Sequence, residues 1–244
     1  MTVLVVGASG ATGRLLVKQL LEKGQLVRAV VRSSERFHDM MTDVDSAGLS
    51  VVEASLLDLS DSEMTELVAD CHAIASCLGH TLSFKGIYGP PRRLVTDATR
   101  RLCQAIQANA GETPVKFVLM NTTGNRNRDL EETISLGQKC VLGLVRLAIP
   151  PHADNEQAAD FLRTKIGQDN RAIEWVVVRP DTLIDEHLVT EYELHPSPTR
   201  SAIFNPGKTS RIQVGHFMAE LITNDEAWKQ WRGQMPVIYD VATS

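Results

Sequence analysis

The sequence predicts an α/β protein whose parallel β-sheet carries helices on both faces. Short apolar runs alternate along the chain with segments of helical periodicity, which is the pattern of repeated strand–helix–strand units. A glycine-rich turn joins the first strand to the first helix. The chain has 244 residues and shows neither an internal repeat nor a dividing linker, so we expect one domain over residues 1–244.

Strands are predicted where apolar residues follow one another between polar turns. These strands are residues 3–6, 25–31, 49–54, 72–77, 115–120, 174–178 and 235–239. Helices are predicted where apolar residues recur every three or four positions. They are a first helix with Leu15, Leu16, Leu20 and Leu21 on one face, then 62–69 (capped by Ser60 or Asp61), about 92–110, around 133–148, and 213–223.

Two segments, residues 121–151 and 181–208, exceed this minimal pattern. Both begin at the carboxyl end of a predicted strand, and the second is rich in His, Tyr, Pro and Thr. Open α/β sheets bind their ligands at that edge. We therefore expect both segments to be insertions on the substrate side of the sheet.

The glycine-rich turn has the spacing Gly7-x-x-Gly10-x-x-Gly13. Gly7 permits a tight turn, Gly10 lets a phosphate approach the backbone, and Gly13 lets the helix pack closely on the strand. The helix N-terminus then offers free N–H groups and a positive dipole to an anion. The turn predicts a pyrophosphate cradle, and hence a Rossmann-type doubly wound parallel sheet of about six to seven strands. The alternative is an ordinary strand-to-helix turn.

The end of the second strand indicates which dinucleotide would bind. A site for NAD usually has a carboxylate there for the ribose 2′-hydroxyl, whereas a 2′-phosphate favours Arg and small hydroxyls. This chain reads Arg32-Ser33-Ser34, with Arg36 close by. We therefore predict NADP(H) as the preferred cofactor, with NAD(H) as a possible one. The alternative is that Arg32 is a solvated loop residue.

Composition excludes several classes of partner. Lys and Arg number 25 against 30 for Asp and Glu, which gives a net charge of −5 and disfavours nucleic acid. No apolar run approaches the roughly 20 residues of a membrane span. The four cysteines, Cys71, Cys77, Cys103 and Cys140, have no spacing typical of a metal site and favour a reducing compartment. We expect a cytoplasmic protein that acts on a small molecule and binds no metal. The sequence is consistent with either a monomer or an oligomer.

Several motifs together resemble a known family. They are Gly7-Ala-Ser-Gly-Ala-Thr-Gly13, Arg32, Cys77-Leu78-Gly79, Val177-Val178-Arg179-Pro180, and Val214-Gly215-His216-Phe217-Met218. These motifs are similar to those of the atypical short-chain dehydrogenases/reductases, and more narrowly of the NAD(P)H-binding, NmrA-like branch that includes flavin reductase/biliverdin reductase B. The resemblance covers nearly the whole chain, except around residues 125–151.

This resemblance implies a set of cofactor contacts. The pyrophosphate would meet Gly7, Ser9, Gly10, Ala11, Thr12 and Gly13. The adenosine phosphate would meet Arg32 with Ser33 or Arg36, and Ser55 and Leu56 would flank the adenine. Leu78, Gly79, Thr122 and Pro180 would line the nicotinamide side.

The catalytic pair of the short-chain dehydrogenases is absent. These enzymes use a Tyr with a Lys four residues on, a spacing that places both on one helix face. Here Tyr88, Tyr192 and Tyr239 are followed at that spacing by Arg92, Pro196 and Thr243. On the helix where relatives carry Lys, an acid or His, this chain has Asn155 and Ala159. Thr122 is left as a candidate hydrogen-bond donor, or else as a hydroxyl that caps the end of a strand.

Further polar candidates follow the Arg179-Pro180 turn. They are Asp181, His187, Tyr192, His195 and Arg200. Each is predicted either to line the substrate cleft or to lie in a surface loop. The two prolines in 195–200 predict a fixed wall rather than a mobile lid. Arg179 is expected in a structural ion pair. Pro150 and Pro151 are expected to open a helix with Asp154 near its cap and with His152 as a minor acid or metal candidate.

Three functions are consistent with these residues. The first is an NADPH-dependent oxidoreductase that transfers hydride to a flavin, a quinone or a similar small acceptor, because an electron-poor ring needs little acid assistance. The second is an NmrA-like regulator that senses dinucleotides without turnover. The third is an epimerase or isomerase, against which the missing Tyr/Lys pair counts most.

Overall fold

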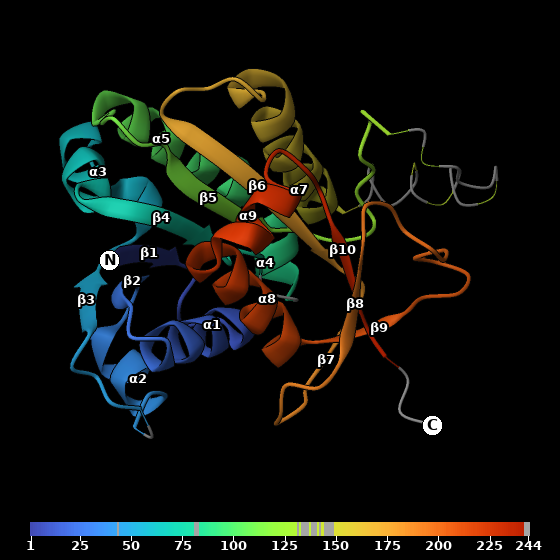
Figure 1. The fold of residues 1–244 in the computed structure, drawn as a ribbon, viewed down its shortest axis with the longest axis horizontal. Helices are drawn as coiled ribbons and strands as arrows, with labels where there is room; N and C mark the ends of the chain where they lie inside the picture. Colours follow the sequence, from blue (N-terminus) through green and yellow to red (C-terminus); the bar gives the residue numbers. More distant parts are fainter. Residues whose placement is uncertain are drawn as a thin grey trace.

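The computed structural model of the protein describes residues 1–42, 44–80, 83–130, 132, 137, 141, 143 and 149–241. Within them, eight strands form one sheet (Figure 1). The strands are β1 (Thr2–Val6), β2 (Leu26–Val31), β3 (Leu49–Glu53), β4 (Cys71–Ser76), β5 (Val115–Met120), β6 (Ile173–Pro180), β8 (Tyr192–His195) and β10 (Val237–Asp240). Their spatial order is β3-β2-β1-β4-β5-β6-β10-β8.

The strand order reverses direction at β1. The chain passes from β1 to β2 and β3 on one side, and then crosses back to β4 on the other side of β1. All neighbouring pairs are parallel except β8, which runs antiparallel to β10. This is the predicted doubly wound Rossmann-type sheet, with a switch point between β1 and β4. The count of about six to seven strands was too low, because the short edge strand β8 lies within 181–208.

Helices cover both faces of the sheet. They are α1 (Ala11–Glu22), α2 (Ser34–Asp39), η1 (Leu56–Asp58), α3 (Asp61–Val68), α4 (Phe84–Tyr88), α5 (Leu94–Ala108), α7 (Pro150–Phe161), a π-helical turn η2 (Leu162–Ile166), α8 (Arg211–Thr223) and α9 (Asp225–Trp231). Figure 1 shows α1, α2, α8 and α9 on one side and α3, α5 and α7 on the other. Two buried clusters result, one on each face.

Strand β1 shows why the central strands are apolar throughout. Val3 and Val5 lie in the cluster beneath α1 and α8, while Leu4 and Val6 lie in the cluster beneath α3 and α5. All four side chains are fully buried. A parallel strand covered on both faces has no polar side, so its sequence does not alternate.

Most predicted elements lie within a few residues of their expected bounds. Ser60 caps α3 as expected: its hydroxyl accepts a hydrogen bond from the N–H of Glu63, and the Glu63 carboxylate accepts one from the N–H of Ser60. The helix around 133–148 falls outside the described residues, apart from 137, 141 and 143. Shorter elements were not predicted; they include α2, α4, α9 and the parallel pair β7 (Thr182–Ile184) and β9 (Lys208–Ser210).

The described parts of the two segments that exceed the minimal pattern begin at the edge where the strands end. Residues 121–130 follow β5, and the segment with β7, β8 and β9 follows β6 (Figure 1). No described helix combines the length and the apolar character needed to cross a membrane.

Candidate functional site

The glycine turn after β1 is built so that a side chain would not fit at two of its positions. Gly7 has φ +74°, and a Cβ there would lie 2.6 Å from the carbonyl carbon and oxygen of Cys77. A Cβ on Gly13 would lie 2.2 Å from the carbonyl oxygen of Gly7. The N–H of Gly10 donates to that same oxygen at 3.0 Å, which closes the turn. The turn therefore needs glycine for backbone conformation and for close packing.

The N-terminus of α1 is left open to an anion. Its cap residue is Gly10, no side chain caps the helix, and the first turn contains no acidic residue. Ser9, Gly10 and Ala11 are exposed, whereas Thr12 and Gly13 are buried against the sheet. First-turn N–H groups have no partner within the helix, so an anion placed there would accept from them and be stabilised by the helix dipole. The geometry fits a pyrophosphate.

At the end of β2, the expected adenosine side, Arg32 and Arg36 are exposed. Ser33 caps α2, its hydroxyl accepting a hydrogen bond from the N–H of Arg36 at 3.3 Å. The sequence prediction missed Glu53, whose carboxylate accepts hydrogen bonds from the N–H and the hydroxyl of Ser34 at 2.8 and 2.5 Å. Both bonds lower the pKa of Glu53. A negative charge therefore lies at the end of β3, on the residue paired in register with Val31, which precedes Arg32.

Ser55 and Leu56 follow β3, where the adenine was expected. Ser55 is exposed and has no capping hydrogen bond to η1. The Leu56 side chain is buried in the core cluster beneath α3 and α5. It can therefore offer only its backbone to a ligand at this edge.

Thr122 lies just beyond β5, at the expected nicotinamide side. Its hydroxyl accepts a hydrogen bond from the N–H of Gly124 at 3.2 Å, so it does cap the turn after the strand. The hydroxyl proton remains available for donation, because a hydroxyl both accepts and donates. His152, in the first turn of α7, packs on the same turn: its Cε1 lies 3.1 Å from the position of a Cβ on Gly124.

Leu78, Gly79 and Pro180 complete the predicted nicotinamide side. Leu78 is half-buried against the core, while Gly79 is exposed and has open space around its Cα. Pro180 is buried, and its carbonyl oxygen accepts a hydrogen bond from the N–H of Thr123 at 3.0 Å. Parallel pairing of β4, β5 and β6 brings these residues to one edge together with Thr122.

Arg179 forms the predicted structural ion pair. Its side chain is fully buried, and the guanidinium binds both carboxylate oxygens of Glu132, at 2.8 and 3.2 Å. The remaining bonds go to the carbonyl oxygens of Met235, Asn125 and Pro196 at 2.6, 2.9 and 3.1 Å. All five N–H donors of the guanidinium are thus used.

The polar candidates of 181–200 do not form a single group. The Asp181 carboxylate accepts from the N–H groups of Thr182 and Gly207, which folds the loop back on itself. His195 and Arg200 both lie against the ring of Tyr239. Asp154 also departs from expectation, because it lies inside α7 and not at its cap. Among the described residues, no group of three or more His, Cys, Asp or Glu could hold a metal ion.

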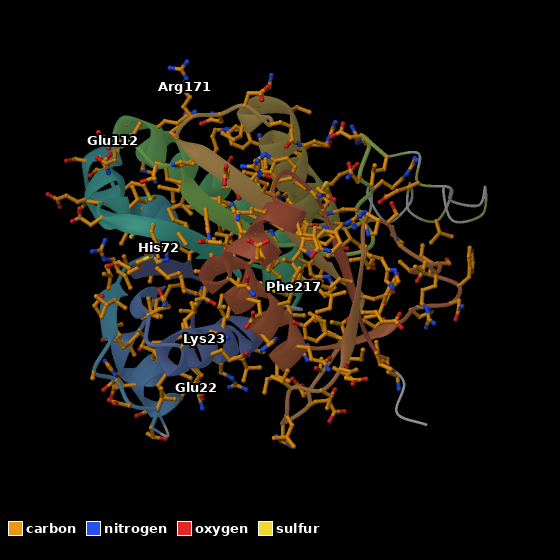
Figure 2. The ribbon with its side chains drawn as sticks, in the orientation of Figure 1. Glu22, Lys23, His72, Glu112, Arg171 and Phe217 are labelled. Atoms are coloured by element: carbon orange, nitrogen blue, oxygen red, sulfur yellow. The ribbon has the colours of Figure 1, made fainter. Side chains whose placement is uncertain are left out.

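His187 and Tyr192 lie elsewhere, beside a groove of about 680 Å³ between α1, residues 186–189 and α8. The Tyr192 hydroxyl is 2.9 Å from Nδ1 of His216, and Lys23 binds Glu220 of α8 at 2.5 Å. Figure 2 labels Lys23 at the end of α1. Burial raises the pKa of Tyr192 to about 12 and lowers that of His216. This network joins α1, α8 and the edge strand β8.

Two histidines predict how stability depends on pH. Burial lowers the pKa values of both His72 and His216 below 6.5, so the folded protein favours their neutral forms. The unfolded chain then takes up protons first, and the free energy of unfolding falls as the pH drops below about 6.5. In urea denaturation between about pH 7.5 and 5.5, the double variant His72→Gln/His216→Gln should show a shallower decline. An unchanged slope would contradict this assignment.

The sequence comparison identifies the family to which this site belongs. A family profile described as NAD(P)H-binding matches residues 7–225, which is most of the chain and includes the glycine turn. The chain belongs to the NAD(P)H-binding family. No curated protein matches this NAD(P)H-binding protein significantly in sequence.

Solved structures share the fold of this NAD(P)H-binding protein. A putative NADH-flavin reductase from Streptococcus pneumoniae is 17% identical to this chain, with a TM-score of 0.65. The alignment covers 99% of this chain and 100% of the reductase. The anaerobilin reductase ChuY from Escherichia coli O157:H7 is 18% identical to this chain, with a TM-score of 0.67. The alignment covers 100% of both chains. A wide-type short-chain dehydrogenase/reductase from Veillonella parvula, solved with NADP, is 15% identical to this chain, with a TM-score of 0.69. The alignment covers 99% of this chain and 95% of the V. parvula protein.

Proposed function

We propose that the protein is an NADPH-dependent oxidoreductase that transfers hydride to a flavin, a quinone or a similar small acceptor. The observation that carries this proposal is the open, uncapped N-terminus of α1 beside the exposed Arg32. The structural relatives from S. pneumoniae and E. coli, described as a putative NADH-flavin reductase and an anaerobilin reductase, support an acceptor of this class.

The residues present fit hydride transfer better than carbonyl chemistry. NADPH, when bound, supplies the hydride. The glycine turn and α1 would hold its pyrophosphate, and Thr122 at the end of β5 would orient the reacting end through its free hydroxyl proton. No Tyr with a Lys four residues on is present to protonate a carbonyl oxygen. A flavin or quinone ring accepts hydride without a strong acid, so orientation and exclusion of water suffice.

The assay that tests this function is simple. Purified protein is mixed with NADPH and a panel of flavins, quinones and simple carbonyls, and absorbance of the reduced nicotinamide is followed. We expect turnover with flavins or quinones and none with simple carbonyls. If no acceptor consumes NADPH although titration shows tight binding, the enzymatic proposal is wrong.

Cofactor preference should depend on two opposing charges at the end of β2. Arg32→Ala should weaken the binding of NADPH more than that of NADH, by about 1–3 kcal/mol, because a charge-assisted contact to the 2′-phosphate is lost. Glu53→Gln should act in the opposite direction and strengthen the binding of NADPH, since it removes the neighbouring negative charge. Isothermal titration with both nucleotides measures these changes. Equal losses for NADPH and NADH in Arg32→Ala would contradict the preference for NADPH.

A second candidate function is a dinucleotide-sensing regulator of the NmrA-like type. The observation that favours it is the missing Tyr/Lys pair, since a sensor needs the cradle and not the catalytic pair. Tight NADPH binding without turnover in the assay above would support it.

We also propose that residues 1–244 form one domain in the cytoplasm. The single sheet that runs from β1 to β10 supports the first statement, because both ends of the chain share it. The free thiols of Cys71, Cys77 and Cys103 support the second, since disulfides are rare in a reducing compartment.

A further inference from the structure

A buried histidine–carboxylate pair lies beyond the end of β4. His80 Nε2 is 2.8 Å from the Oδ2 atom of Asp154, and the two side chains are only 5% and 1% exposed. His80 follows Leu78 and Gly79, whereas Asp154 lies in α7, 74 residues further along the chain. Neither side chain has a role in the cofactor contacts described so far.

Hydrogen bonds hold both members of this pair in place. The Asp154 carboxylate accepts from the N–H groups of Val95 and Thr96 at 2.8 and 2.9 Å, as well as from His80. The other ring nitrogen of His80 faces the carbonyl oxygen of Gly86 at 3.2 Å. A carbonyl and an ionised carboxylate only accept, so each ring nitrogen of His80 faces an acceptor. His80 therefore bridges the Asp154 carboxylate and the Gly86 carbonyl.

The pair joins the segments that surround one end of the cofactor cradle. Through His80 it fixes the chain after β4 and holds α4 at Gly86. Through Asp154 it caps the N-terminus of α5 and ties α7 to it, with a further bond from the Thr96 hydroxyl to the Asp154 carbonyl at 2.8 Å. Four segments are therefore linked through one hydrogen-bonded pair.

The glycine turn places this pair relative to the dinucleotide. A Cβ on Gly7 would lie 2.6 Å from the carbonyl oxygen of Cys77 and 2.8 Å from the backbone nitrogen of Leu78, so that peptide is in direct contact with the turn. His80 comes two residues later, at the edge that β4 shares with β5 and Thr122. The opposite side, with β2 and Arg32, is the adenosine side. In a doubly wound sheet, the nicotinamide half lies on the β4–β5 side of the switch point.

We infer that His80 and Asp154 are positioning residues that hold residues 77–80 against the nicotinamide half of the dinucleotide. This inference deepens the proposed function and rests on its cofactor site. The pair acts through the backbone of Leu78 and Gly79, so it affects only ligands that extend past the pyrophosphate.

The test compares two ligands that differ in that half. NADPH spans the whole site, whereas adenosine 2′,5′-bisphosphate occupies only the adenosine side. Dissociation constants are measured by titration for the unchanged protein, His80→Gln and the more conservative Asp154→Asn. We expect both variants to bind NADPH about tenfold more weakly, from the loss of a charged hydrogen bond, and the bisphosphate within about twofold of the unchanged protein.

His72→Gln is the matched control. His72 lies at the amino end of β4, the strand that precedes His80, and its Nδ1 is 2.7 Å from the carbonyl oxygen of Thr2 (Figure 2). It should leave the affinity for both ligands unchanged even where it lowers the thermal midpoint. Equal weakening of both ligands in His80→Gln and Asp154→Asn, or no weakening of either, would overturn the inference. So would a lack of NADPH binding by the unchanged protein, whereas binding without turnover would overturn only the proposed reaction.

Discussion

Gly7→Ala is expected to abolish NADPH binding and to lower the free energy of unfolding by about 2–4 kcal/mol. The new methyl group would enter a backbone conformation with φ +74° and would lie 2.6 Å from the carbonyl group of Cys77. Backbone atoms on both sides would have to move, and the turn that holds the pyrophosphate would open. Titration with NADPH and urea denaturation measure the two effects.

Gly24→Ala separates the backbone conformation from the clash. Gly24 follows α1 at its opposite end and has φ +71°, close to that of Gly7, but no atom lies within 4 Å of its added Cβ. The free energy of unfolding of this variant should fall by only about 1–2 kcal/mol, which is the cost of placing an alanine in the left-handed backbone conformation. Its affinity for NADPH should be unchanged. If Gly7→Ala behaves like Gly24→Ala in both measurements, contact between the glycine turn and β4 does not shape the site.

Arg179→Met is expected to lower the free energy of unfolding by about 3–5 kcal/mol, because it leaves the carboxylate of Glu132 buried without its partner. Glu132 is 3% exposed and accepts two of the five hydrogen bonds of the guanidinium. The three carbonyl oxygens of Met235, Asn125 and Pro196 would also lose their donor. Urea denaturation of the purified variant provides the measurement.

Two further variants make this result interpretable. Arg232→Ala removes an ion pair of similar length, 2.9 Å to Glu174, in which the arginine side chain is 58% exposed. Exposed pairs contribute about 0–1 kcal/mol, so this variant should remain close to the unchanged protein. Adding Glu132→Gln to Arg179→Met should recover part of the lost stability, since the unpaired charge is gone. A loss below about 1 kcal/mol in Arg179→Met would show that the pair is not an anchor.

The order and type of the long elements could be predicted from the sequence because each depends on its own residues. The β1–α1 unit carries its signal in the apolar run and in three glycines that lie close together in the chain. Short elements such as α2 and β8 have too few residues for periodicity to be visible, and tertiary contacts define them. Strand β8, for example, exists through its antiparallel pairing with β10.

The site divides in the same way. The glycine turn is local in sequence, so its geometry could be predicted, whereas the polar pairs around the site join residues that are far apart in the chain. Asp154 caps α5 from another helix, and Glu132 reaches Arg179 across 47 residues. Glu53 had a usable signal: it ends β3 and is paired in register with Val31, next to Arg32. Parallel pairing of the second and third strands would have placed it there.

The partners of Arg179 have a consequence for which substitutions the surrounding segments tolerate. Three of its contacts are backbone carbonyls, on the segments around Asn125, Pro196 and Met235. Backbone recognition does not depend on the identity of the side chain at those positions. A substitution at any of these three positions therefore leaves the hydrogen bond to the guanidinium in place. What limits such a substitution is packing, since Asn125 and Met235 are each only 2% exposed.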